Sequence, residues 1–348
     1  MKDVAARAGV SIKTVSRVVN NDRYISADVR GRVEEAVAAL GYVVDTAARA
    51  LRSGRDTALG VAVPDLGDPF FAGIIRGIES RARSRGVSVL VSSLGESAAD
   101  EPAAVEALLQ RRISGLILAP ISVDHSYLQP WAARAPVLFV DRPPQNLLVD
   151  SIIEDDEGAT AAAVGQLLAI GHERVALLAP DPVVVTVQRR VRGYRTALAA
   201  AGLPQDEALE VVVPQSAAAA RKALIELLAS PSPPTALLLA SSGVATRVVP
   251  LAHALGRTDL AMVSFGDFGM ADALIPSISA LDQRPVELGA AAADRVFHRL
   301  DKPGSRLKRS ILLPITLIDR ESGRLRPDAH RPPAPSAGDA PRGLKRAL

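Results

Sequence analysis

Basic and hydroxyl side chains gather in one short helical pattern near the N-terminus, within the string SIKTVSRVVN at 11–20. Three valines of this string recur at helical spacing and are predicted to turn inward, at Val15, Val18 and Val19. The side chains left on the outer face or at the leading end are those of Ile12, Lys13, Thr14 and Arg17. Guanidinium, ammonium and hydroxyl groups arranged in this way can hydrogen-bond the base edges and phosphates of DNA.

Two further helical patterns must position this segment. Asp3–Ala8 precedes it, Gly9 supplies a turn, and Ser11 stands where an N-cap would start the next helix. Ser26 is placed to cap a third helix, and Gly41 to stop it. The apolar residues of that third helix are Val29, Val33, Val37 and Leu40. The spacing predicts a helix-turn-helix, whose second helix enters the major groove; a plain three-helix bundle is the alternative.

The rest of the chain alternates apolar strand patterns with helix-length segments. The predicted strands are Leu59–Val63, Val87–Ser92, Gly115–Leu118, Val137–Val140, Val175–Leu178, Glu210–Val213, Ala236–Leu239, Ala261–Phe265, Ile278–Leu281 and Ile311–Leu317. Repeated strand–helix–strand units predict parallel sheets with right-handed crossovers. Two successive sets of about five strands favour two similar lobes, with a ligand in the crevice at the carboxyl ends of the strands.

Charge and composition narrow the function further. Residues 1–55 hold ten Lys and Arg against six Asp and Glu, whereas 56–319 hold 24 against 29. A polyanionic partner is therefore expected at the N-terminus, because the acidic body would repel one. The chain has no Cys and only five scattered His, so we expect no metal site and no cofactor. It shows no signal peptide and no membrane-spanning run, which predicts a cytoplasmic protein without membrane contact.

Longer strings carry a family resemblance. DVAARAGVSIKTVSRVVN, VEEAVAALGY and AARALRSGR together resemble the lactose/galactose repressor family of bacterial transcription regulators. The resemblance implies that Ile12, Lys13 and Arg17 read bases, with a bidentate contact from Arg17 to a guanine. Residues implied to contact phosphates are Ser11, Thr14, Ser16 and Asn20. For Lys13, an ordinary solvated lysine is the alternative.

The family also implies a hinge helix at 46–55 whose Leu51 inserts into the minor groove and kinks the DNA. A short helix of this length is marginal alone, so it is expected to form with its dimer mate on DNA. A buried leucine in an ordinary helix is the alternative. Val44-Asp45 replaces the Pro-Asn that many members carry before the hinge, so the preorganisation of this hinge is expected to differ.

The resemblance continues through the body of the chain to about residue 320. Leu59–Val91, FVDR at 139–142, GHERVALLAP at 171–180 and RVRGYRTAL at 190–198 match the family's sensor. The implied effector-binding residues are Asp68, Phe70, Phe71, Asp141, Arg190, Ser241, Asp267 and Gln283. A core position for Phe71 and a surface salt bridge for Arg190 are the alternatives. A sugar or sugar derivative is the expected effector, and a ligand with an anionic group near Arg190 is a weaker option.

The expected architecture is an N-terminal all-α helix-turn-helix plus hinge helix, followed by an α/β two-lobed, periplasmic-binding-protein-like sensor with parallel sheets. The predicted ranges are 1–45 for the helix-turn-helix, 46–55 for the hinge, 56–319 for the sensor and 320–348 for a disordered tail. Within the sensor, the first lobe is expected at 56–153 and 285–310, and the second at 154–282 and 311–319. We expect a homodimer on a near-palindromic operator.

Three other functions are alternatives to this one. An extracytoplasmic sugar receptor would share the two-lobed fold, but it would carry a signal peptide and would lack the basic N-terminus. An enzyme would need a phosphate loop, a nucleophile elbow or a metal cluster, and the sequence contains none in the right form, so no catalytic residue is predicted. A regulator controlled by a protein partner stays open, and gel filtration with candidate partners would address it.

Overall fold

A computed structural model describes residues 1–19, 22, 24–41, 58–95, 97–214 and 216–327. The chain divides into two compact units, Met1–Thr57 and the main unit that begins at Ala58. The predicted hinge helix at 46–55, with Leu51, lies outside the described residues, as does Asn20.

Three short helices form the N-terminal unit, α1 (Lys2–Ala8), α2 (Ile12–Val19) and α3 (Ala27–Ala39). Their core consists of small apolar side chains, among them the fully buried Val4, Val15 and Val33. Ser11 caps α2 as predicted, because its Oγ accepts a hydrogen bond from the Thr14 N–H at 3.1 Å. Ser26 occupies the N-cap position of α3 but makes no capping side-chain bond, which corrects that expectation.

The main unit holds two six-stranded sheets. The first has the order β11-β5-β4-β3-β1-β2 and the second the order β12-β10-β9-β8-β6-β7. The strands of the first sheet, which defines the first lobe, are β1 (Ala58–Val63), β2 (Ser88–Ser93), β3 (Gly115–Leu118), β4 (Val137–Val140), β5 (Asp150–Glu154) and β11 (Ser310–Leu313). The strands of the second lobe are β6 (Val175–Ala179), β7 (Glu210–Val212), β8 (Ala236–Leu239), β9 (Ala261–Phe265), β10 (Ser279–Asp282) and β12 (Thr316–Ile318).

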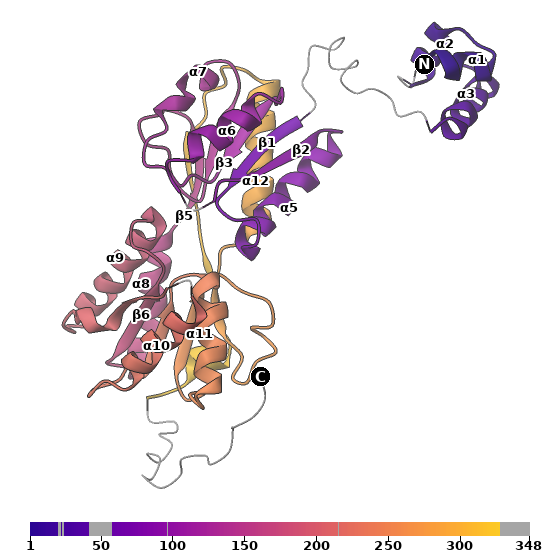
Figure 1. Cartoon of the computed structure of the whole chain (residues 1–348). Helices are drawn as coiled ribbons and strands as arrows, with labels where there is room; N and C mark the ends of the chain where they lie inside the picture. Colours follow the sequence, from indigo (N-terminus) through magenta and orange to yellow (C-terminus); the bar gives the residue numbers. More distant parts are fainter. Residues whose placement is uncertain (20–21, 23, 42–57, 96, 215, 328–348) are drawn as a thin grey trace. The chain divides into compact units, whose positions relative to one another are not determined.

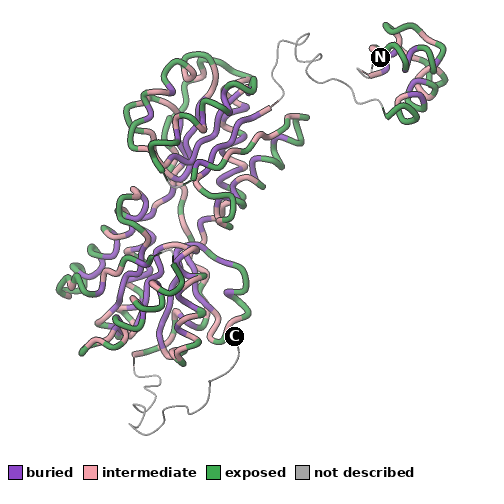
Figure 2. Tube along the Cα trace, in the orientation of Figure 1, coloured by how far each residue is buried: buried purple, intermediate pink, exposed green. Residues whose placement is uncertain are grey.

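Helices cover both faces of each sheet, as continuously apolar strands require. The helices of the first lobe are α5 (Pro69–Ser84), α6 (Glu101–Leu109), η1 (Ser126–Leu128), α7 (Gln129–Ala132) and α12 (Pro285–Asp301). Those of the second lobe are α8 (Asp156–Ala169), α9 (Val185–Ala200), η2 (Glu207–Leu209), α10 (Ala217–Leu228), α11 (Ser242–Ala254) and η3 (Glu321–Arg324). Figure 2 shows the buried residues concentrated in the strands of both sheets.

Helices α5 and α12 lie side by side in the first lobe and approach unusually closely (Figure 1). A Cβ built on Gly77 would stand 2.1 Å from the Val286 carbonyl oxygen, and one on Gly289 would stand 2.0 Å from the Ile74 carbonyl oxygen. Glycine is therefore required at both positions, because any side chain would collide with backbone of the other helix.

Two strand predictions were wrong in detail. β5 was not expected, and together with β11 it brings the first sheet to six strands. The single strand predicted at 311–317 is two strands, because Pro314 has no N–H to donate to a ladder and ends the first of them. As a result β11 pairs with β5 in the first lobe, not in the second as expected. β12 pairs with β10 antiparallel, so the second sheet is not wholly parallel.

The chain crosses between the lobes three times, between Glu154 and Asp156, between Asp282 and Pro285, and between Leu313 and Thr316. The Asp155 N–H donates to the Leu313 carbonyl at 3.2 Å, so the first and third crossings are hydrogen-bonded to each other. Gln283, in the second crossing, donates through Nε2 to Glu154 Oε2 at 3.3 Å. All three crossings are therefore linked at one place.

The tail predicted from residue 320 begins later than expected. Arg320 holds Asp267 in a two-armed ion pair, Ser322 is fully buried, and the Leu325 carbonyl lies 2.8 Å from Nε2 of the buried His172. These contacts fix the segment through Leu325 to the second lobe. Residues 328–348 lie outside the described ranges.

Candidate DNA-binding and effector-binding sites

Helix α2 presents the predicted DNA-contacting side chains on its outer surface. Ile12 is 46% exposed although it is a large apolar residue, and Lys13 and Arg17 are also exposed. The inward valines Val15 and Val18 hold the helix against α1 and α3. An exposed apolar side chain and two cations on the outer surface of one helix are the arrangement that direct base readout uses.

Local hydrogen bonds hold the polar groups of this surface. Arg17 Nε donates to Asp22 Oδ2 at 2.9 Å, so the guanidinium already has an acidic partner. This bond and the neighbouring backbone N–H of Tyr24 lower the pKa of Asp22. The hydroxyl groups of Ser11 and Thr14 are hydrogen-bonded to each other at 2.9 Å. Ser16 is half-buried.

Arg190 is the centre of the second site. Its side chain is only 7% exposed, and its Nε and Nη2 lie 2.9 and 2.8 Å from Asp156 Oδ1. Nη1 donates to the Ala240 carbonyl at 2.8 Å, and the guanidinium carbon stands 3.6 Å above the Phe265 ring. Arg190 is therefore no surface salt bridge. It joins α9 to the start of α8 and to the ends of β8 and β9.

Two further carboxylates face this arginine, Asp141 and Glu154. Both side chains are buried, Asp141 just after β4 and Glu154 at the end of β5. Burial raises the pKa of Asp141 against the opposing effect of Arg142, whose Nε lies 3.2 Å from Asp141 Oδ2. Burial, reinforced by Asp141 and Asp156, raises the pKa of Glu154 well above its ordinary value.

The backbone at Asp141 is strained. Its φ is 65°, a left-handed value for a residue with a side chain, and the Arg142 N–H donates to the Val140 carbonyl across it at 2.6 Å. Such strained turns concentrate at functional sites. This turn directs the Asp141 carboxylate toward the group around Arg190.

The predicted residues of the first helix of the sensor split into two environments. Asp68 caps α5 by accepting the Phe70 N–H at 2.9 Å, and it also accepts a longer bond from Ser242 Oγ of the second lobe at 3.4 Å. Burial raises the pKa of Asp68. Phe70 is half-buried and packs edge-on against Phe71. Phe71 belongs to the core of the first lobe, which was the alternative for that residue.

Ser241 and Asp267 form hydrogen bonds within the second lobe. Ser241 caps α11 through the Val244 N–H at 3.1 Å. Arg320 donates hydrogen bonds to both carboxylate oxygens of Asp267, at 2.8 and 2.7 Å. Within the described part of the chain, no hydrogen bond or ion pair joins Asp267 to the group around Arg190. Gln283, in contrast, contacts Glu154 directly.

Two carboxylates of this group, Glu154 and Asp156, are not among the residues predicted from the sequence. The signal was present as the string EDDEG directly after an apolar pair, Ile152-Ile153. Because β5 was not recognised, these carboxylates were not placed at a strand end. We call the set of Asp68, Asp141, Glu154, Asp156, Arg142 and Arg190 the crevice cluster.

Other site classes are not supported by the described residues. No group of three His, Asp or Glu among them has the geometry to hold a metal ion. None of the described helices is long and apolar enough to cross a membrane.

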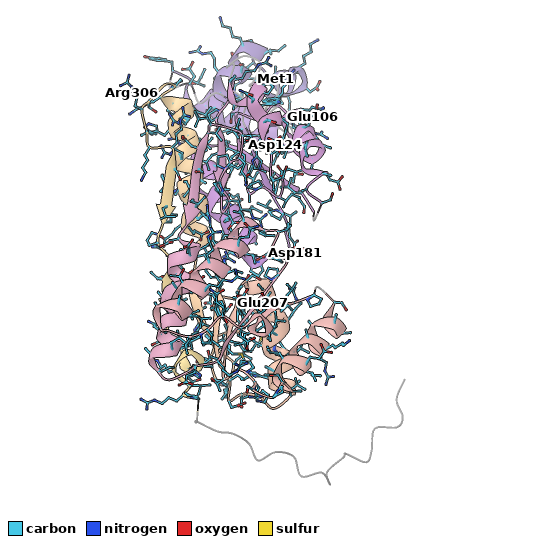
Figure 3. The ribbon with its side chains drawn as sticks, turned by 90° about the vertical axis from the view of Figure 1, so that its left-hand side faces the viewer. Met1, Glu106, Asp124, Asp181, Glu207 and Arg306 are labelled. Carbon is cyan, nitrogen blue, oxygen red and sulfur yellow. The ribbon has the colours of Figure 1, made fainter. Side chains whose placement is uncertain are left out.

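Asp181, labelled in Figure 3, lies in the loop between β6 and α9 and its carboxylate accepts the Val183 N–H at 2.9 Å.

Comparison with known proteins covers both units. Residues 1–45 match the family of bacterial regulatory proteins called the lacI family, and residues 56–321 match the periplasmic binding proteins and sugar binding domain of the LacI family. The lactose operon repressor of Escherichia coli K12 is 32% identical over 92% of this chain and 89% of its own length. The ribose operon repressor of the same strain is 28% identical over 92% and 99%.

Solved structures agree. A lac repressor dimer bound to operator and the anti-inducer ONPF is similar with a TM-score of 0.79 and 31% identity, over 92% of this chain and 98% of that one. A complex of the regulator CelR with cellobiose is similar with a TM-score of 0.67 and 27% identity, over 92% and 98%. With both units matched and the order of the units the same, the chain belongs to the LacI family of DNA-binding transcription regulators.

Proposed function

We propose that this protein is a cytoplasmic repressor that binds a near-palindromic operator as a homodimer. A sugar or sugar derivative that binds in the crevice between the lobes would weaken or strengthen its affinity for the operator. The observation that carries the proposal is the outer surface of α2, where exposed Ile12, Lys13 and Arg17 stand together on a helix fixed by its valines. A dimer would place two such helices on half-sites about one helical turn apart.

The crevice cluster supports the sensing half of the proposal. It joins groups from both lobes beside the three crossings. A ligand bound there would therefore favour one arrangement of the two lobes over another. Its roles are binding and not turnover, and the relatives with printed functions are regulators. We assign the protein no catalytic residue.

The test is genome-wide capture of DNA fragments by the purified full-length protein. We expect a sharp near-palindrome of about 14–20 base pairs upstream of a transport or catabolic operon. The substrates of that operon then nominate effectors. Diffuse binding that disappears as salt rises would instead mean that only phosphates are contacted, and it would contradict the roles given to Ile12, Lys13 and Arg17.

A further inference from the structure

The crevice cluster contains more negative than positive groups. Three carboxylates, on Asp68, Glu154 and Asp156, each interact electrostatically with a fourth, on Asp141. Two guanidiniums, those of Arg142 and Arg190, accompany them. Arg190 pairs with Asp156 at 2.8 Å, while Arg142 has its Nε 3.2 Å from Asp141 Oδ2 and donates through Nη1 to the Pro120 carbonyl at 2.6 Å. In the described ranges, Glu154 and Asp68 have no ion-pair partner.

Buried carboxylate oxygens in this cluster also lack hydrogen-bond donors. Glu154 Oε1 and Asp156 Oδ2 are buried without a hydrogen-bond partner among the described residues, and both side chains belong to residues only 2% exposed. A buried acceptor without a donor is costly, and a buried charge without a counter-charge costs more. These two oxygens therefore call for donors that the protein does not supply.

The same geometry disfavours an acidic ligand. Arg190 has Asp156 on one edge, the Ala240 carbonyl on another and the Phe265 ring beneath it. Its charge is therefore compensated by Asp156 and its guanidinium stacks on Phe265. Little positive charge and few N–H donors remain for binding a phosphate or carboxylate. Any ionised carboxylate of the crevice cluster would also repel such a group. This argues against the anionic ligand that the sequence left open.

We propose that the effector of this site is a polyhydroxylated amine, such as an amino sugar, whose protonated nitrogen binds at Glu154 and Asp156. The inference rests on the proposed function, because it takes the crevice as the effector site. A hydroxyl group could satisfy one unpartnered oxygen, but an ammonium group supplies up to three donors together with the missing positive charge.

Proton linkage gives the proposal a second signature. Glu154 is faced by Asp141 after β4, Asp156 of α8, Arg190 of α9 and Gln283 after β10, and this surrounding raises its pKa. An ammonium group would favour the ionised carboxylate, so binding should release a proton. The heat of binding measured in buffers of different ionisation enthalpy should report that release.

The experiment is calorimetric titration of the full-length protein at neutral pH with matched ligands. The probes are glucosamine, galactosamine and mannosamine, each compared with its parent hexose and with the corresponding hexose 6-phosphate. We expect at least one amine to bind tenfold or more tightly than both of its partners. The proposal is overturned if a hexose or a hexose phosphate binds more tightly than every amine, or if no amine binds.

A variant pair separates charge recognition from folding. Glu154→Gln keeps the side-chain shape and removes the charge, so the amine-to-hexose affinity ratio should collapse toward one. Glu157→Gln is the matched control. Glu157 follows Glu154 by three residues, lies at the surface of α8 and pairs with Arg192 at 3.1 Å. An unchanged ratio in the folded Glu154→Gln protein would refute the assignment. DNA capture by the wild type tests the proposed function separately, so the two can fail independently.

Discussion

At the scale of single residues, Arg190 is both a candidate ligand contact and a structural requirement. Its partner Asp156 has a side chain only 1% exposed. Removing one member of a buried ion pair strands the other charge and costs about 3–5 kcal/mol, whereas replacing both by apolar groups is often neutral. Loss of effector response in an Arg190 variant would therefore be ambiguous unless stability is measured as well.

We predict that Arg190→Met lowers the free energy of unfolding of the main unit by about 3–5 kcal/mol. The double variant Arg190→Met with Asp156→Leu should recover most of that loss, because no charge is left stranded. Urea denaturation followed by circular dichroism measures both. A double variant no more stable than the single one would mean that the Ala240 carbonyl and the Phe265 ring contribute more than the ion pair does.

Arg17 has to leave a partner before it can read a base. In the free protein its guanidinium is bonded to Asp22. Arg17→Ala is expected to weaken operator binding by about 1–3 kcal/mol and to relax the preference at one base pair. Fluorescence anisotropy on operator and random duplexes measures the two effects. Arg7→Ala, an exposed arginine on α1, is the control. Equal losses on both duplexes would make Arg17 a phosphate contact.

At the scale of elements, the contact between α5 and α12 makes the first lobe sensitive to a single methyl group. Gly289→Ala would place a Cβ on the Ile74 carbonyl oxygen, so we expect a destabilisation of about 1–3 kcal/mol or more. Gly165→Ala is the matched control, because nothing lies within 4 Å of a Cβ there and α8 should gain about 0.5–1 kcal/mol. Thermal unfolding of the two variants should move in opposite directions. A neutral Gly289→Ala would show that the helices separate at little cost.

Elements with strong local signals were predictable from the sequence. The capping by Ser11, the three N-terminal helices and nine of the strands follow from periodicity and turn residues. β5 was missed because Asp150 and Ser151 give it a polar start, although both are buried. Asp150 is instead compensated by the guanidinium of Arg299 at 2.8 Å, a contact 149 residues away in the chain that no local pattern reveals.

The candidate site was predictable only in part, for the same reason. Asp68, Asp141, Arg190 and Gln283 were placed by resemblance, and the structure brings them to one region. Glu154 and Asp156 depend on β5 and on the first crossing, so their burial could not be foreseen. The ion pair between Asp267 and Arg320 could not be predicted, because the sequence pattern places Arg320 in a disordered tail.

At the scale of the whole molecule, the crevice cluster makes stability depend on pH. Folding raises the pKa of Glu154, Asp141 and Asp68. At a pH between the ordinary and the raised values, the folded protein keeps protons that the unfolded chain has released. Stability therefore falls as pH rises through that window. The buried His125 and His172 have lowered pKa values and act in the opposite direction, losing stability as pH falls below about 6.5.

A comparison of variants isolates the contribution of Glu154 from that of the histidines. Glu154→Gln mimics the protonated carboxyl, so its stability should be close to that of the wild type at pH 5. Because glutamine cannot ionise, the variant should become the more stable protein as pH rises toward 8, by at most about 1.4 kcal/mol per pH unit within the window. Urea denaturation at a series of pH values measures the difference, with Glu157→Gln expected to run parallel to the wild type. A difference that stays constant with pH would show that Glu154 titrates as an ordinary glutamate, and that the three crossings meet at a fully ionised site.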